Sequence, residues 1–315
     1  MKPPSPQRST TAATASDAGK TVHLIPVDSA IKRLCFDEAT GTLRPNLVLV
    51  DRQGAVVFEI NELGLKGAAR DPSRRLAVVW GDSVVFGIRW SWPCLLDELA
   101  SGYQFLNGGI EGDPYDNILR RAAAFNRQHQ VALNILMLGW HPMQRPAQVG
   151  GDRRGLFARV RRIGAALRAP KASADLAPSR DPDDPGLRAD LSAFVQAVPN
   201  TVLATMPTAL NRTIVGRDLS ARFIRGDRDT AFNFAGDAPY SVDLQRYLFD
   251  HITRRNAAVR EVAQASGVRL VDLAAVFDTE ALADFRADFH DVLHLRPRAY
   301  PKAAAAIHAG IRDLL

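Results

Sequence analysis

From Arg75 onward, short apolar runs alternate with segments of helical periodicity, and this alternation restricts the fold classes open to the chain. The first run, Leu76-Ala77-Val78-Val79-Trp80, contains no polar residue, which is typical of a strand buried on both faces of a parallel sheet. Four further strands are predicted at residues 103–107, 131–138, 201–205 and 268–272. Helices are predicted near residues 93–101, 115–128, 155–167, 187–195, 241–266 and 298–315. The pattern predicts an α/β fold with a five-stranded parallel sheet, helices on both faces, and a site beyond the carboxyl ends of the strands.

The rest of the 315 residues divides into a tail, a small N-terminal part and two insertions. Residues 1–20 are rich in Pro, Ser, Thr and Ala and are predicted to be disordered. Residues 21–72 are predicted to form a small β-rich appendage, with a hairpin whose strands, 46–50 and 55–60, flank an Asp-Arg-Gln-Gly turn. The main domain is predicted to span residues 73–315, with insertions at about 144–186 and 211–239.

Composition and charge exclude several classes of protein. A formal net charge of +6, scattered outside one segment, does not indicate a nucleic-acid binder. Cys35 and Cys94 have no partners at metal-ligand spacing, so neither a disulfide scaffold nor a zinc module is expected. The tail has no apolar run of the roughly seven residues that a secretory signal needs, and no stretch approaches the about 18 of a membrane span. We expect a cytoplasmic protein with reduced cysteines; the tail, rich in Ser and Thr, leaves a transit peptide as the alternative.

Two sequence segments bring together the residue types of nucleophilic catalysis. Ser83 follows Gly81-Asp82 directly after the first predicted parallel strand, where the start of a helix supplies backbone donors. Val85 stands where the α/β-hydrolase elbow requires glycine, so that elbow is absent. Asp291 and His294 lie three residues apart before the last predicted helix. A serine hydroxyl needs a base to accept its proton, and the base needs a carboxylate to orient it, so these three residues suffice for acyl transfer.

The motifs resemble those of the SGNH, or GDSL, hydrolases, which are esterases, lipases and some acyltransferases. The resemblance covers about residues 75–312 and rests on the segments 79–87, 106–113, 202–207, 256–260, 267–273 and 291–300. It implies a flavodoxin-like three-layer α/β/α fold. It also implies that Ser83 is the nucleophile, His294 the base and Asp291 its orienting acid, with the amides of Ser83 and Gly112 in the oxyanion hole. No metal or other cofactor is implied.

One block departs from the family pattern. Gly139 is in place after the central strand, but His141 stands where the family has its oxyanion-hole asparagine. A neutral imidazole donates one hydrogen bond, so His141 is a candidate for the same role. Its other readings are a contact to a different substrate group, or lost activity. Asp82 and Trp140, next to these residues, are candidate substrate-binding residues.

Two further segments have no assigned role. Asn61-Glu62-Leu63-Gly64-Leu65-Lys66-Gly67 resembles a stretch found upstream of the nucleophile block in a subset of the family, and we expect it to pack on the main sheet. Residues 145–172 carry eight basic side chains and one acidic one, a net charge of +7, around an apolar helical face. We expect a helix packed on the core with a solvated basic face; the alternatives are a lid, a patch for an anionic substrate or partner, and a contact with a membrane surface without stable insertion.

The sequence therefore predicts a serine esterase acting on a small-molecule carboxylic ester, such as a short acyl or carbohydrate ester. An O-acyltransferase would use the same triad and acyl-enzyme, with an alcohol in place of water. An alternative of another class is a binding protein that keeps the fold and has lost turnover, which the His141 substitution motivates. A nucleotide-binding site has no support, because no glycine-rich phosphate loop follows any predicted strand.

Overall fold

The computed structural model describes residues 21–24, 34–51, 53–87, 92–139, 185–213, 215, 242–278, 287–289 and 293–315. The predictions for the tail at 1–20, for the helix at 155–167 and for most of both insertions fall outside these residues.

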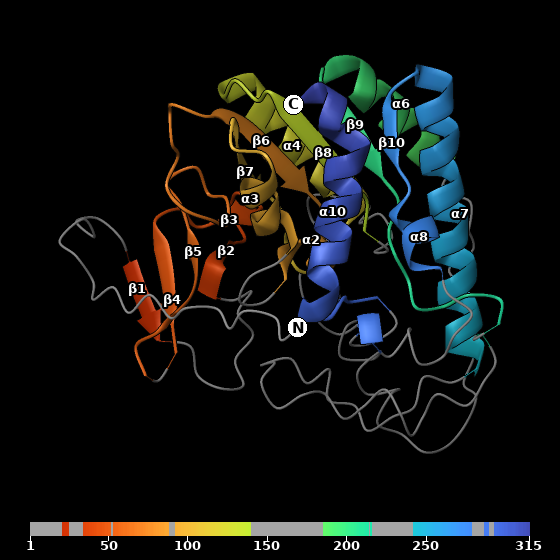
Figure 1. Ribbon diagram of the computed structural model, residues 1–315, viewed down its shortest axis with the longest axis horizontal. Coiled ribbons are helices and arrows are strands. Elements are labelled where there is room, and N and C mark those ends of the chain that lie inside the picture. The colour runs from red at the N-terminus through yellow and green to blue at the C-terminus, as the bar shows by residue number, and fades with distance from the viewer. Residues whose placement is uncertain are drawn as a thin grey trace, which may run out of the picture.

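The main part of the chain is built on five parallel strands in the order β10-β9-β8-β6-β7 (Figure 1). Their bounds are β6 Arg75–Trp80, β7 Tyr103–Asn107, β8 Leu133–Met137, β9 Thr201–Ala204 and β10 Arg269–Val271. Of these five strands, β6 comes first along the chain and lies inside the sheet, and β7 comes second and lies at its edge. This is the flavodoxin-like order. The predicted fold class and all five predicted strands are confirmed, with ends shifted by at most two residues.

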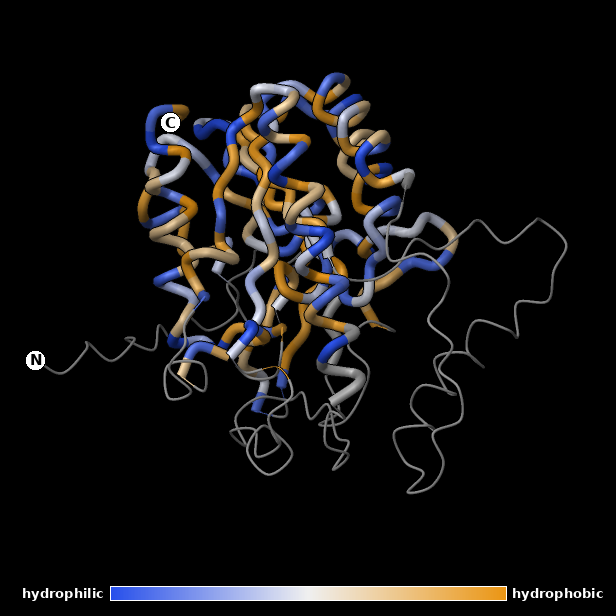
Figure 2. The backbone as a smooth tube through the Cα atoms, turned by 90° about the vertical axis from the view of Figure 1, so that its right-hand side faces the viewer, coloured by the Kyte–Doolittle hydropathy of each residue, from blue (hydrophilic) through white to orange (hydrophobic). Residues whose placement is uncertain are grey.

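Helices cover both faces of this sheet because each strand buries side chains on both sides. On one face, Ala77 and Val79 of β6 share a core with α10 (Tyr300–Ile311) and with η1 (Trp92–Leu95). On the other face, Val78 and Trp80 pack with the helices α4 (Tyr115–Gln128), α6 (Pro185–Ala197) and α7 (Val242–Ser266). In Figure 2 the helices alternate between hydrophilic and hydrophobic residues along their length, as expected for elements with one apolar side.

Apart from the helix predicted at residues 155–167, which lies outside the described residues, the predicted helices match these elements except in one place. The helix expected at residues 93–101 is a 3₁₀ turn, η1, continued by the short helix α3 (Leu96–Leu99). Pro93 lies in this first turn and has no N–H to donate, which suits the start of a helix better than its interior. The helix α8 (Leu273–Phe277), which was not predicted, follows β10 and is capped by the Asp272 side chain. Among the described residues, no helix has the length and apolarity to cross a membrane.

Two small sheets precede β6. The predicted hairpin is confirmed as β4 (Leu47–Val50) paired antiparallel with β5 (Val56–Ile60), and β1 (Thr21–Leu24) adds to β4 in parallel. The strands β2 (Phe36–Asp37) and β3 (Thr42–Leu43) form a second pair. We call these strands, together with the turn that follows β5 through Gly67, the N-terminal β-unit.

The hydrophobic core of the N-terminal β-unit is shared with loops at the carboxyl ends of the main sheet. Leu49, Phe58 and Ile60 from this unit form one cluster with Phe86 and Ile110, which follow β6 and β7. The ring of Phe58 meets that of Phe86 edge-on at 5.6 Å between centroids. The N-terminal β-unit therefore packs against the loops that follow β6 and β7.

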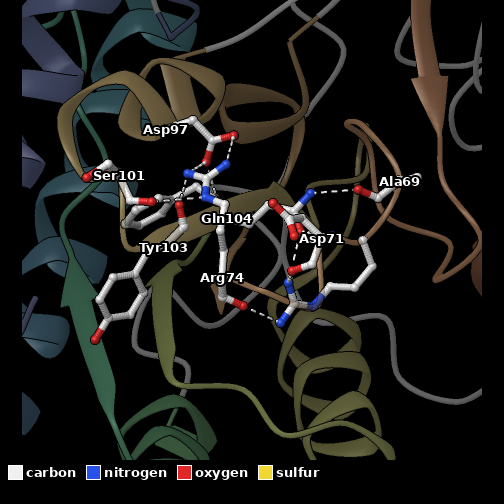
Figure 3. A network of polar contacts seen from close by, with 9 residues as sticks. Ala69, Asp71, Arg74, Asp97, Ser101, Tyr103 and Gln104 are labelled. Atoms are coloured by element: carbon white, nitrogen blue, oxygen red, sulfur yellow. Dashed lines mark hydrogen bonds and ion pairs between the residues drawn. The ribbon is translucent and has the colours of Figure 1, made fainter.

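A polar network also fixes the segment between the N-terminal β-unit and β6 (Figure 3). Gln104 of β7 is buried; its Oε1 accepts the N–H of Asp71 at 2.8 Å and its Nε2 donates to the Ala69 carbonyl at 2.8 Å. The guanidinium of Arg74 pairs with the Asp97 carboxylate at 3.3 Å and donates to the Ser101 carbonyl. These contacts hold the segment against α3 and β7.

Candidate active site

Ser83 lies at the carboxyl end of β6, as the first residue of the four-residue helix α2 (Ser83–Phe86). Asp82 is fully buried, and its Oδ1 accepts the amide N–H of Val84 at 3.0 Å, so it caps this helix. The amide of Ser83 has no acceptor within the helix, as for any first-turn N–H. Asp82 thus has a defined contact with the protein backbone, and the predicted substrate contact of this residue stays a prediction.

His294 reaches the same point from the opposite end of the sequence. Its Nε2 lies 2.8 Å from the Oγ of Ser83, across 211 residues of chain. Phe289 pairs with Leu295 in an isolated antiparallel bridge, and Arg296 donates from its backbone N–H to Asp288 and from its Nε to Phe289. These bonds close the loop that presents His294. Asp291, three residues before His294 in the sequence, lies outside the described residues.

The loop after β7 lies against the start of α2. The N–H of Gly108 donates to Val79 at 2.8 Å, and the N–H of Ile110 donates to the Gly81 carbonyl at 3.1 Å. Gly112 has a φ of +67°, a backbone conformation that glycine adopts without strain. The structure therefore brings the loop of Gly112 next to the segment that carries Ser83, and the predicted oxyanion role of Gly112 stays a prediction.

Arg121 of α4 fixes this loop through its guanidinium group. Its guanidinium donates to Asp113 Oδ2 from Nε at 2.9 Å and from Nη2 at 2.5 Å, and Nη1 donates to the Gly108 carbonyl at 3.0 Å. Both side chains of the ion pair are more than nine-tenths buried. A buried pair of this kind defines one loop conformation because breaking it leaves a charge without compensation. This pair was not predicted from the sequence: Asp113 lies in a matched block, but nothing in the spacing indicates Arg121.

Asn107 and Lys66 hold the other end of α2, and neither of them was predicted to have a role in the site. The Nδ2 of Asn107 donates to Val85 at 2.7 Å and to Phe86 at 3.2 Å, while its Oδ1 accepts the N–H of Gly109 at 2.8 Å. One buried amide thus links α2 to the loop after β7.

Lys66 is buried, with its ammonium next to the last residues of α2. Its Nζ donates to the carbonyls of Phe86 at 2.7 Å and Gly87 at 3.1 Å. It also lies 4.7 Å and 4.6 Å from the ring centroids of Phe58 and Phe86. Burial lowers the pKa of Lys66 from 10.5 to about 8. A cationic side chain at this position complements the carbonyl end of a helix and the faces of the two rings.

Gly139 follows β8 and allows Asp82 to lie close to the backbone. A Cβ at this position would lie 2.1 Å from Oδ2 of Asp82, so a larger residue does not fit without movement. The buried Arg255 of α7 donates to the Gly139 carbonyl. Trp140 and His141 follow immediately but lie outside the described residues, so their predicted roles stay predictions. Within the described part of the chain, no group of three or more His, Cys, Asp or Glu residues could hold a metal ion.

The strand order and the Ser83–His294 contact define a flavodoxin-like α/β protein with a serine–histidine pair at the carboxyl ends of its strands. No protein-family model matches the chain, and no curated protein matches it in sequence. Among solved structures, it is similar to a lipase/acylhydrolase from Enterococcus faecalis, with 16% identity and a TM-score of 0.44 over 76% of this chain and 96% of that one.

Two further solved structures are similar to the chain at the same level. One is a GDSL-like lipase from Bacteroides thetaiotaomicron, with 13% identity and a TM-score of 0.43 over 79% of this chain and 93% of that one. The other is an acetyl xylan esterase from Geobacillus stearothermophilus, with 13% identity and a TM-score of 0.44 over 76% and 94%. At such identities and TM-scores these similarities assign no activity, and the function proposed below rests on the residues of this chain.

Proposed function

We propose that this protein is a serine hydrolase that cleaves carboxylic esters, with Ser83 as nucleophile and His294 as general base. The observation that carries the proposal is the 2.8 Å separation of Ser83 Oγ and His294 Nε2. It lies within the range of about 2.6–3.2 Å in which a base accepts a proton directly. The hydroxyl and the imidazole lie 211 residues apart in the sequence and meet beyond the carboxyl ends of the strands.

In the first half of the reaction, Ser83 Oγ attacks the ester carbonyl carbon while its proton passes to His294 Nε2. The new Oγ–C bond gives a tetrahedral oxyanion. When this collapses, the C–O bond to the alcohol breaks, and His294 donates its proton to the departing oxygen. An acyl group then remains on Ser83. In the second half, His294 takes a proton from water, whose oxygen attacks the acyl carbon. The Oγ–C bond then breaks and releases the acid, and His294 returns the proton to Ser83 Oγ.

The oxyanion is stabilised by backbone donors at the start of α2 and in the loop after β7. The proposal assigns this role to the amides of Ser83 and Gly112, with His141 as a third donor. Hydrogen bonds from buried Asn107 and Arg121 support it, because they fix both segments before substrate arrives and so reduce the reorganisation needed during reaction. Asp291 is the proposed carboxylate that orients His294 and stabilises its protonated form.

Hydrolysis of p-nitrophenyl acetate tests this proposal. We expect the wild-type protein to release p-nitrophenol, and Ser83→Ala and His294→Ala each to lower kcat by about 10,000-fold or more without unfolding the protein. His308→Ala, in the last helix, is the matched control and should retain wild-type kcat. Adding an alcohol acceptor distinguishes hydrolysis from acyl transfer, because a transferase would form a new ester. If Ser83→Ala hydrolyses the ester as fast as the wild type, the proposal is wrong.

A further inference from the structure

We propose that Lys66, in the N-terminal β-unit, is a positioning residue for the nucleophile: it holds the carbonyl end of α2 and thereby fixes Ser83 at the other end. The inference rests on the proposed function, because it takes Ser83 to be the reacting group. It also gives the segment 61–67 a role beyond packing on the main sheet.

First, helix α2 is too short to be stable through its own hydrogen bonds alone. A helix of four residues closes very few internal hydrogen bonds, and isolated helices of this length do not persist in water. The Asp82 cap fixes only the start of α2, so fixing its end requires hydrogen bonds from other parts of the chain. The last carbonyls of a helix have no partner within it. In this protein Lys66 and Asn107 supply the missing donors.

The second argument is the direct bond between the held end and the nucleophile. The N–H of Gly87 donates to the carbonyl of Ser83 at 3.1 Å, and the carbonyl of the same Gly87 accepts from Lys66 Nζ. A shift of Gly87 therefore acts on the Ser83 backbone through one hydrogen bond. The Ser83 amide is also a proposed oxyanion donor, so the same shift would disturb both the attacking group and the oxyanion hole.

The third argument is that the backbone of Lys66 is itself fixed. Its N–H donates to the carbonyl of Asn107 at 2.9 Å, and its own carbonyl accepts the N–H of Asn107 at 3.0 Å. The preceding turn is shaped by Asn61, whose Oδ1 accepts the N–H groups of Leu63 and Leu65. Lys66 is thus anchored to the edge strand β7 while its side chain extends to α2.

The test compares Lys66→Met with Leu49→Ala in the full-length protein. Methionine has a side chain of similar length but no hydrogen-bond donor. Leu49→Ala weakens the hydrophobic cluster of the N-terminal β-unit and removes none of the hydrogen bonds to α2. We expect Lys66→Met to lower kcat for p-nitrophenyl acetate by about 10- to 100-fold with little change in KM, because uniform binding is unaffected. The rate at which a fluorophosphonate labels Ser83 should fall by the same factor. Leu49→Ala should keep both rates even though its unfolding midpoint falls.

Hydrogen–deuterium exchange provides a readout that does not depend on activity. We expect the amides of Phe86 and Gly87 to exchange at least about 10-fold faster in Lys66→Met, with exchange in β8 unchanged. Unchanged exchange at these amides overturns the inference, and so does a labelling rate equal to that of the wild type. If the wild type neither reacts with the phosphonate nor hydrolyses esters, the proposed function fails, and the exchange measurement alone decides whether Lys66 holds α2.

Discussion

At the residue scale, the site depends on a close approach between a side chain and the backbone of the neighbouring strand. Asp82 can cap α2 only because Gly139 leaves room for its carboxylate. Real Cβ atoms do not approach other heavy atoms below 3.0 Å, and a Cβ on Gly139 would lie 2.6 Å even from the Cβ of Asp82. The requirement for glycine at this position is therefore steric.

Gly139→Ala should displace Asp82, remove the helix cap and shift Ser83. We expect a loss of about 2–4 kcal/mol in the free energy of unfolding, combining overpacking with the lost cap. Phosphonate labelling of Ser83 should also slow. Gly102→Ala is the matched control, because no atom lies within 4 Å of its added Cβ, and it should change stability by less than about 0.5 kcal/mol. Equal urea midpoints for the two variants would show that the steric argument is wrong.

The sequence predicts which residues approach one another at the site better than it predicts the bonds that hold them there. Ser83 and His294 could be paired because motif order and the carboxyl ends of parallel strands bring them to one place. Lys66 could not be assigned a role, since its bonds to α2 depend on how the N-terminal β-unit docks on β7. That docking leaves no periodic signal in the sequence.

At the element scale, α4 does more than cover one face of the sheet. Its Arg121 crosses to the loop after β7, where it binds Asp113 and the Gly108 carbonyl. The limits of α4 were predicted from periodicity, and Pro114 directly before it favours a helix start there. The contact of Arg121 with the loop after β7 was not predicted. Helical periodicity places Arg121 on one face of α4 but does not indicate which loop that face contacts.

Arg121→Met should destabilise the protein because it leaves the Asp113 carboxylate buried without its cation. The expected loss is about 3–5 kcal/mol in the free energy of unfolding. The neighbouring Arg120→Met is the matched control, since Arg120 is exposed, and it should cost less than about 0.5 kcal/mol. Urea denaturation followed by circular dichroism measures both. A small, equal loss in the two variants would mean that the ion pair does not fix the loop.

At the scale of the whole molecule, three hydrophobic clusters organise the described residues. Two lie on the two faces of the main sheet, and the third joins the N-terminal β-unit to Phe86 and Ile110. Because this third cluster crosses from one part of the chain to the other, we expect the N-terminal β-unit and the main sheet to unfold together.

Phe58→Ala tests this cooperativity. Every tryptophan of the chain lies at residue 80 or later, so tryptophan fluorescence reports on the main part alone. Removing a buried ring should cost about 3 kcal/mol and lower the fluorescence-detected Tm by about 4 °C. Val56→Ala, on the same strand but exposed, should leave it unchanged. A fluorescence-detected Tm that is the same in Phe58→Ala as in the wild type would show that the two parts unfold independently.

The central claim is that Ser83 is an activated nucleophile, and labelling with a fluorophosphonate probe tests it most directly. The modified peptide is located by mass spectrometry in the wild type and in His294→Ala. The account predicts stoichiometric label on Ser83 in the wild type and almost none when His294 is removed, because the hydroxyl then has no base at 2.8 Å. A folded wild-type protein that carries no label on Ser83, or equal labelling of the two proteins, would contradict it.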